Sequence, residues 1–92
     1  MTANIDFAYP GASLLENRAN TTIYQTGDLP TAVTAWYKGE INRRGMSTTS
    51  FIQTSTNDNI LNKLVGAKNN ATVAVEISRA AADSKTKITV TL

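Results

Sequence analysis

Two segments near the C-terminal end of the chain alternate between apolar and polar residues. Residues 72–77 read Thr-Val-Ala-Val-Glu-Ile, and residues 87–92 read Lys-Ile-Thr-Val-Thr-Leu. Because side chains two residues apart lie on the same face of a strand, both segments are predicted to be strands with one buried face. The side chains expected to point inward are Val73, Val75, Ile77, Ile88, Val90 and Leu92.

A helical spacing of apolar residues occupies the stretch that precedes Gly45. One helical face carries the apolar residues that recur every three or four positions, namely Leu29, Val33, Trp36, Tyr37 and Ile41. We expect Asp28 to cap the N-terminus and Pro30 to lie in the first turn, where its missing N–H costs nothing. Gly45 is expected directly after the last turn, because glycine adopts the left-handed conformation found there.

The remaining segments predict further strands. Residues 21–26 and 47–54 combine β-branched residues with short alternations, and residues 12–17 form a short strand in which Leu14 and Leu15 give one apolar residue to each face. Residues 58–66 fit two structures: a strand that continues to Lys68, or a second short helix capped by Asp58. We favour the strand, because the following Asn69-Asn70 pair tolerates the positive φ angles of a tight hairpin turn.

These elements together predict an α+β fold. We expect a mainly antiparallel sheet with one main helix packed on one face, in the order β-β-α-β-β-β-β, with the short helix over residues 58–66 as the alternative. A length of 92 residues suits a single domain over residues 1–92, in which residues 1–8 form a lead-in. No apolar run approaches the roughly 20 residues needed to cross a bilayer, so no membrane span is predicted in the chain.

The composition narrows the possible chemistry. The chain contains no cysteine and no histidine, which removes thiol nucleophiles, the commonest general base and the commonest metal ligands. Three carboxylates that could serve an enzyme, Asp28, Glu40 and Glu76, lie on different predicted elements. We therefore expect no enzymatic activity, no cofactor and no metal site. The net charge of +2 comes from scattered basic residues, so no nucleic-acid partner is expected either.

Two groups of residues are candidate binding sites. Trp36 and Tyr37 are aromatic residues of the kind that anchor ligands and partners, although helix-to-sheet packing would explain them equally well. Tyr9, Pro10 and Gly11 form a shaped turn, because Pro fixes one φ angle and Gly permits an unusual one. Such a turn can recognise a partner, or it can simply direct the first strand.

Three polar features each have a functional and a structural interpretation. Glu40 lies near the apolar helix face, where we expect it to pair with Arg43 or Arg44. Asp58 could bind calcium, but its neighbours are more typical of a turn. Residues 84–87, Ser-Lys-Thr-Lys, match the Ser-x-x-Lys motif of serine acylases. In those enzymes the Ser begins a buried helix, whereas here a loop entering a strand is predicted.

The order of these features resembles a family of small bacterial domains of unknown function, found in lipoproteins and other exported proteins. The resemblance covers residues 7–46. It rests on a Tyr-Pro-Gly-Ala start, a strand ending in Tyr-x-Thr, and a helix with an aromatic pair closed by a glycine: Tyr9 to Ala12, Tyr24, Thr26, Trp36, Tyr37 and Gly45. Met46 departs from the pattern, since those relatives often carry Trp there. The resemblance implies a non-catalytic role in the cell envelope.

The sequence thus favours a non-enzymatic binding or structural domain of the bacterial envelope that acts through protein–protein contacts. The partner is an unknown protein, or a second copy that pairs through an edge strand. The alternative is a carrier of a lipid, sugar or peptide with a pocket near Trp36 and Tyr37. We expect an exported protein, periplasmic or lipid-anchored, whose signal segment lies outside the printed sequence.

Overall fold

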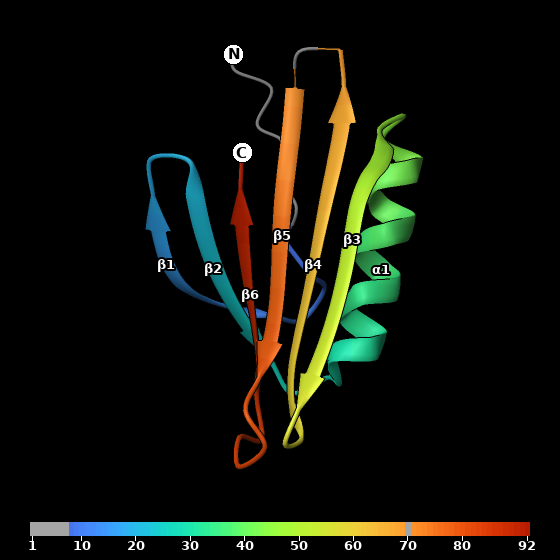
Figure 1. Cartoon of the computed structure of the whole chain (residues 1–92). Coiled ribbons are helices and arrows are strands. Elements are labelled where there is room, and N and C mark those ends of the chain that lie inside the picture. Colours follow the sequence, from blue (N-terminus) through green and yellow to red (C-terminus); the bar gives the residue numbers. More distant parts are fainter. Residues whose placement is uncertain (1–7, 70) are drawn as a thin grey trace.

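In the computed structural model, which describes residues 8–69 and 71–92, six strands form one antiparallel sheet and one helix packs on it (Figure 1). The elements are β1 (Ser13–Arg18), β2 (Thr21–Thr26), α1 (Pro30–Arg43), β3 (Ser47–Thr56), β4 (Asn59–Lys68), β5 (Ala71–Arg79) and β6 (Thr86–Thr91). The predicted α+β class and element order are confirmed. The ambiguous segment at residues 58–66 belongs to strand β4, so the alternative of a second helix is wrong.

The strands lie in the order β1-β2-β6-β5-β4-β3, which leaves β1 and β3 at the two edges (Figure 1). Strands β3 to β6 form consecutive antiparallel hairpins. The last strand then pairs with β2, from Thr21 opposite Thr91 to Thr26 opposite Thr86. Strand β6 therefore joins the N-terminal hairpin to the rest of the sheet.

Asparagine and aspartate form the tight turns at both ends of β4. Asn57 and Asp58 have φ angles of 51° and 68°, which are typical of the two-residue hairpin turn between twisted strands. The turn predicted there is confirmed. Asn69 has a φ of 54° in the next turn, while Asn70, the second residue of that predicted turn, lies outside the described residues.

Helix α1 is capped differently at its two ends. At its C-terminus Gly45 has a φ of 79°, its N–H donates to the Asn42 carbonyl, and Met46 donates to the Ile41 carbonyl. This is the Schellman motif, so the predicted role of Gly45 is confirmed. At the N-terminus the capping residue is Leu29, without a side-chain cap. The prediction that Asp28 caps the helix is wrong.

The core lies between α1 and the sheet face that it covers. The helix contributes Val33, Tyr37 and Ile41, all with 0% exposed surface. The sheet contributes the inward side chains of three central strands: Leu64, Val73, Val75, Ile77, Ile88 and Val90. Two predicted inward residues are exposed instead, Leu29 at 63% and Leu92 at 46%. Leu29 precedes the first helical turn and Leu92 follows the last residue of β6, so neither belongs to the face that its pattern suggested.

The helix packs closely on the sheet at Gly66 of β4. A methyl group added to Gly66 would lie 2.8 Å from Cγ2 of Ile41 and 3.2 Å from its Cγ1. These distances are shorter than a normal van der Waals contact, so a larger residue at this position would displace the Ile41 side chain. Glycine at this position sets the depth at which Ile41 enters the core.

Replacing Gly66 with alanine is therefore expected to destabilise the protein by about 1–3 kcal/mol through overpacking. The matched control is Gly39→Ala on α1, where an added methyl group meets no atom within 4 Å. That change should stabilise the protein by up to about 1 kcal/mol, since alanine favours the helix. Urea unfolding monitored by far-UV circular dichroism measures both effects. Equal stability of the Gly66→Ala variant and the original protein would contradict the close approach.

Candidate binding surfaces

Three of the residues predicted as binding candidates form one aromatic cluster. Tyr9 packs against Trp36 with ring centroids 5.5 Å apart and against Tyr37 at 6.3 Å, and the two helix residues are 4.9 Å apart. Tyr37 has no exposed surface, Tyr9 retains 9%, and Trp36 is partly buried. The cluster extends the core along one flank of α1. The structure thus favours the packing interpretation of these aromatic residues.

A set of hydrogen bonds fixes Tyr9 to the segment before the helix. The Tyr9 hydroxyl donates to Oδ2 of Asp28 at 2.7 Å. Asp28 is held in turn by Thr86, whose hydroxyl donates to its carbonyl at 2.6 Å, and its own N–H donates to Oγ1 of Thr26 at 3.3 Å. The hydrogen bond to Asp28, together with burial and the carboxylate charge, raises the pKa of Tyr9 above 10.0. We call Tyr9, Thr26, Asp28 and Thr86 the clasp.

The other two candidates, Pro10 and Gly11, form the exposed turn between Tyr9 and strand β1. The Ala12 N–H donates to the Tyr9 carbonyl at 3.0 Å, and Gly11 has a φ of 81°. Proline followed by a glycine with positive φ is the signature of a type II turn. The turn reverses the chain directly after the clasp, so it directs β1 along the sheet.

The Glu40 carboxylate is fully engaged by two arginines. Its two oxygens accept hydrogen bonds from Arg43 Nη2 at 2.7 Å, and Oε2 also accepts one from Arg44 Nε at 2.9 Å. Only 5% of Glu40 is exposed, and the hydrogen bonds from Arg43 lower its pKa despite that burial. The predicted pairing is confirmed, and the carboxylate has the properties of a structural ion rather than of a proton donor.

Strand β3 forms an uncharged edge of the sheet. All ten of its residues are exposed, and none of them carries a charge in the sequence Ser-Thr-Thr-Ser-Phe-Ile-Gln-Thr-Ser-Thr. Both edge strands are interrupted by a bulge, but the opposite edge, β1, differs because it also carries Glu16 and Arg18. Charges and bulges are the usual means of blocking an edge against further strands. Strand β3 carries no such charge.

A small groove lies between α1 and β3, on the flank of the helix away from Tyr9. Its volume is about 200 Å³, and its lining includes Thr34, Lys38, Phe51 and Asn62. Asn62 is 1% exposed; its Nδ2 donates to the Thr34 hydroxyl at 2.9 Å, whereas its Oδ1 has no hydrogen-bond partner among the described residues. Lys38 extends over the Phe51 ring at 3.7 Å from the centroid. A buried acceptor without a partner in the described part of the chain therefore lies in the wall of the groove, near an aromatic ring.

Sequence reasoning missed Asn62, although a signal for it was present. In the alternation along β4, Ile60 and Leu64 point toward the helix, so the intervening Asn62 also points there. A polar residue in an inward position needs a partner, which marks it as a structural or functional group.

The described residues include no group of three acidic side chains placed to hold a metal ion. Within the same ranges, no helix combines the length and apolar character needed to span a membrane.

The fold and these surfaces define a small domain in which one helix packs across an antiparallel sheet. The chain matches the model of the START domain-like family over residues 11–90, and it therefore belongs to that family. No curated protein and no solved structure matches it. The family match identifies neither an organism nor a cellular compartment.

Removing the Tyr9 hydroxyl tests the clasp. Tyr9→Phe should cost about 1–2 kcal/mol of stability at neutral pH, because Asp28 loses a hydrogen bond and the ring stacking remains. Since the folded protein raises the pKa of Tyr9, this contribution is complete below pH 10 and is lost as the pH rises through the folded-state value. The two proteins should therefore converge in stability at high pH. Unfolding monitored by the fluorescence of Trp36, the single tryptophan, measures the difference.

Proposed function

We propose that this domain is a non-enzymatic binding module that associates with a second copy of itself through the free edge of β3. The single observation that carries the proposal is the uncharged edge strand of ten residues, all of which are exposed. An edge strand offers unpaired N–H and C=O groups to an incoming strand, which supplies affinity through main-chain hydrogen bonds.

A two-fold axis through Ile52 gives a favourable antiparallel pairing. Ile52, which is 55% exposed, would then pack against its own copy on the sheet face opposite the helix. Ser50 would face Thr54 of the second copy, and no charged side chain would face another along the edge. Such pairs of β-branched and hydroxyl residues stabilise neighbouring strands. The two sheets would become one continuous sheet with both helices on the same side.

The proposal that the domain is not an enzyme is supported by the hydrogen bonds and ion pairs that already occupy its acidic side chains. Asp28 is held by the clasp, and Glu40 by two arginines. Glu76 lies on a third element, in β5. An export-linked role in the bacterial envelope forms part of the proposal and rests on the Tyr-Pro-Gly-Ala resemblance. The start of the natural gene tests it, since an envelope protein requires a signal sequence ahead of this domain.

The association is tested by size-exclusion chromatography with light scattering over a range of protein concentrations. The original protein should form dimers, and Ile52→Lys should be monomeric, because charges on an edge oppose strand pairing. The matched control is Leu15→Lys, which places the same charge on the opposite edge at a residue that is 49% exposed. It should leave the dimer intact. A monomer at all concentrations, or an equal loss in both variants, would refute pairing through β3.

A second candidate function is the binding of a small amphiphilic ligand. Two observations favour it: the groove with the unpaired Oδ1 of Asn62, and membership of the START domain-like family, since START domains typically bind lipids. The groove lies on the opposite flank of α1 from the aromatic cluster, so Phe51 rather than Trp36 would contact the ligand. A hydroxyl or amide of the ligand would donate to Asn62.

Filling the groove tests this second function. Ala35 is exposed and lines the groove, so Ala35→Trp should abolish any ligand-induced rise in melting temperature. Ala32→Trp, at an exposed helix position outside the groove lining, should retain it. The probes are fatty acids, monoacylglycerols and short peptides, measured by differential scanning fluorimetry. No shift with any probe, or the same shift in both variants, would count against the groove as the ligand site.

A further inference from the structure

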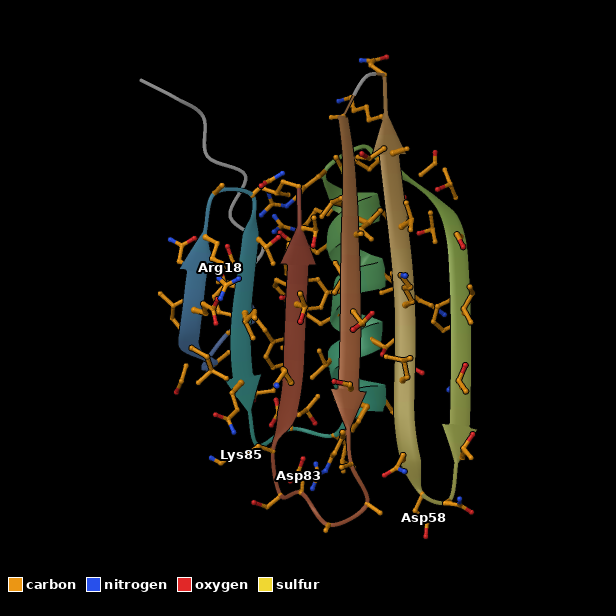
Figure 2. All side chains as sticks on the ribbon, turned by 60° about the vertical axis from the view of Figure 1, so that its left-hand side comes forward. Arg18, Asp58, Asp83 and Lys85 are labelled. Atoms are coloured by element: carbon orange, nitrogen blue, oxygen red, sulfur yellow. The ribbon has the colours of Figure 1, made fainter. Side chains whose placement is uncertain are left out.

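A larger cavity lies at the end of the sheet where the β5–β6 loop turns. Its volume is about 540 Å³. Its floor is a row of side chains on four neighbouring strands, on the face opposite the helix: Gln25, Leu61, Ser78 and Lys87. The loop forms its wall, and Figure 2 shows Asp83 and Lys85 in that loop, at the same end of the molecule as Asp58. The cavity is thus separate from the β3 edge and from the groove beside Asn62.

The loop that walls the cavity is held in one conformation by three hydrogen bonds. The Ala81 N–H donates to Oδ1 of Asn59 at 2.8 Å, which ties the loop to strand β4. Within the loop, the Asp83 N–H donates to the Ala80 carbonyl at 2.9 Å, and Arg79 Nε donates to the Asp83 carbonyl at 3.1 Å. The last bond also orients the Arg79 guanidinium. The cavity wall is therefore preorganised, which lowers the entropic cost of binding.

Basic side chains outnumber acidic side chains in the lining of this cavity. Arg79, Lys85 and Lys87 line it against the single carboxylate of Asp83. Within residues 8–69 and 71–92, none of the three cations forms an ion pair. Nη1 of Arg79 is buried and lacks any hydrogen-bond partner in the same part of the chain. A guanidinium nitrogen left without a partner is costly. Because Nη1 has almost no accessible surface, an anion with several acceptor oxygens would reach it only after the partly exposed Arg79 side chain turns toward the cavity.

We propose that this cavity binds the phosphate group of an organic phosphate. Three cations and one carboxylate leave an excess of positive charge that a phosphate dianion neutralises, and the Ser78, Ser84 and Gln25 side chains offer further donors. The volume lies within the range of small-molecule sites and exceeds the needs of a phosphate alone. The organic part of the ligand would lie over Leu61, which is 41% exposed on the cavity floor.

This assignment also accounts for the Ser-x-x-Lys motif at residues 84–87. Ser84 and Lys87 both line the cavity, while the intervening Thr86 points to the opposite face and joins the clasp. Ser84 lies in a loop rather than at the start of a buried helix, as the sequence predicted. The two residues are therefore placed to bind an anion together.

The site is tested by isothermal titration calorimetry with inorganic phosphate and glycerol 3-phosphate at fixed ionic strength. The double variant Lys85→Gln/Lys87→Gln should bind glycerol 3-phosphate at least about tenfold more weakly than the original protein. The matched control, Lys63→Gln/Lys68→Gln, removes the same charge at exposed positions outside the cavity lining and should change the affinity less than about twofold. All four lysines are exposed, so both variants should keep the original melting temperature.

Arg79→Lys provides a second test, because it keeps the charge and removes the planar guanidinium fork from the cavity lining. It should also weaken the binding of glycerol 3-phosphate. Equal weakening in the two lysine double variants would overturn the proposal, since general electrostatic attraction would then explain the binding. The absence of phosphate binding in the original protein would overturn it as well.

The origin of the phosphate is distinguished by a sedimentation assay with phosphatidylcholine vesicles that contain phosphatidic acid. Co-sedimentation that the Lys85→Gln/Lys87→Gln variant loses would identify a lipid headgroup as the ligand. Binding of glycerol 3-phosphate without co-sedimentation would identify a soluble organic phosphate. Neither the dimer test at β3 nor the ligand test at the groove depends on this result.

Discussion

The close packing of Ile41 of α1 on Gly66 of β4 is the constraint on which the other features depend. A single helix of 14 residues covers only part of a six-stranded sheet: it contacts β3, β4 and β5, and Gly66 of β4 allows Ile41 to pack closely there. The strands on either side are then covered incompletely. On one side Tyr9 fills the space beside the helix, and on the other the groove and the bare edge of β3 remain. Because the helix packs closely on only part of the sheet, the groove and the edge strand β3 beside it stay exposed.

Local sequence signals predicted the elements well, because the apolar alternation of β5 and β6 and the glycine after α1 act over a few residues. The errors arose where distant residues compete for the same group. Asp28 has the chemistry of a helix cap, yet its carboxylate accepts a hydrogen bond from Tyr9. Leu29 and Leu92 continued an apolar pattern past the last residue that can reach the core. A pattern specifies which face is buried, but tertiary structure decides where that face ends.

The sites were harder to predict than the fold for the same reason. The sequence identified Tyr9, Trp36 and Tyr37 but not that Tyr9 closes over the other two. The basic cavity brings Gln25 of β2 beside Lys87 of β6, and that neighbourhood exists only once the strand order is known. The uncharged composition of β3 was visible in the sequence, whereas its place at an edge was not. Pairing across the whole chain, rather than any local motif, assembles these surfaces.

The position of β6 between β2 and β5 has a consequence for how the protein is made. During synthesis the β1–β2 hairpin appears first, and an isolated two-stranded hairpin is marginally stable in water. Its partner strand is the last one in the sheet, so the pairing of Thr21 with Thr91 closes a long loop late in folding. The same strand brings Thr86 to Asp28 and Lys87 to Gln25. Pairing of β6 therefore completes the sheet and the cavity lined by Arg79, Lys85 and Lys87 at the same time. A partly synthesised chain that lacks β6 has neither.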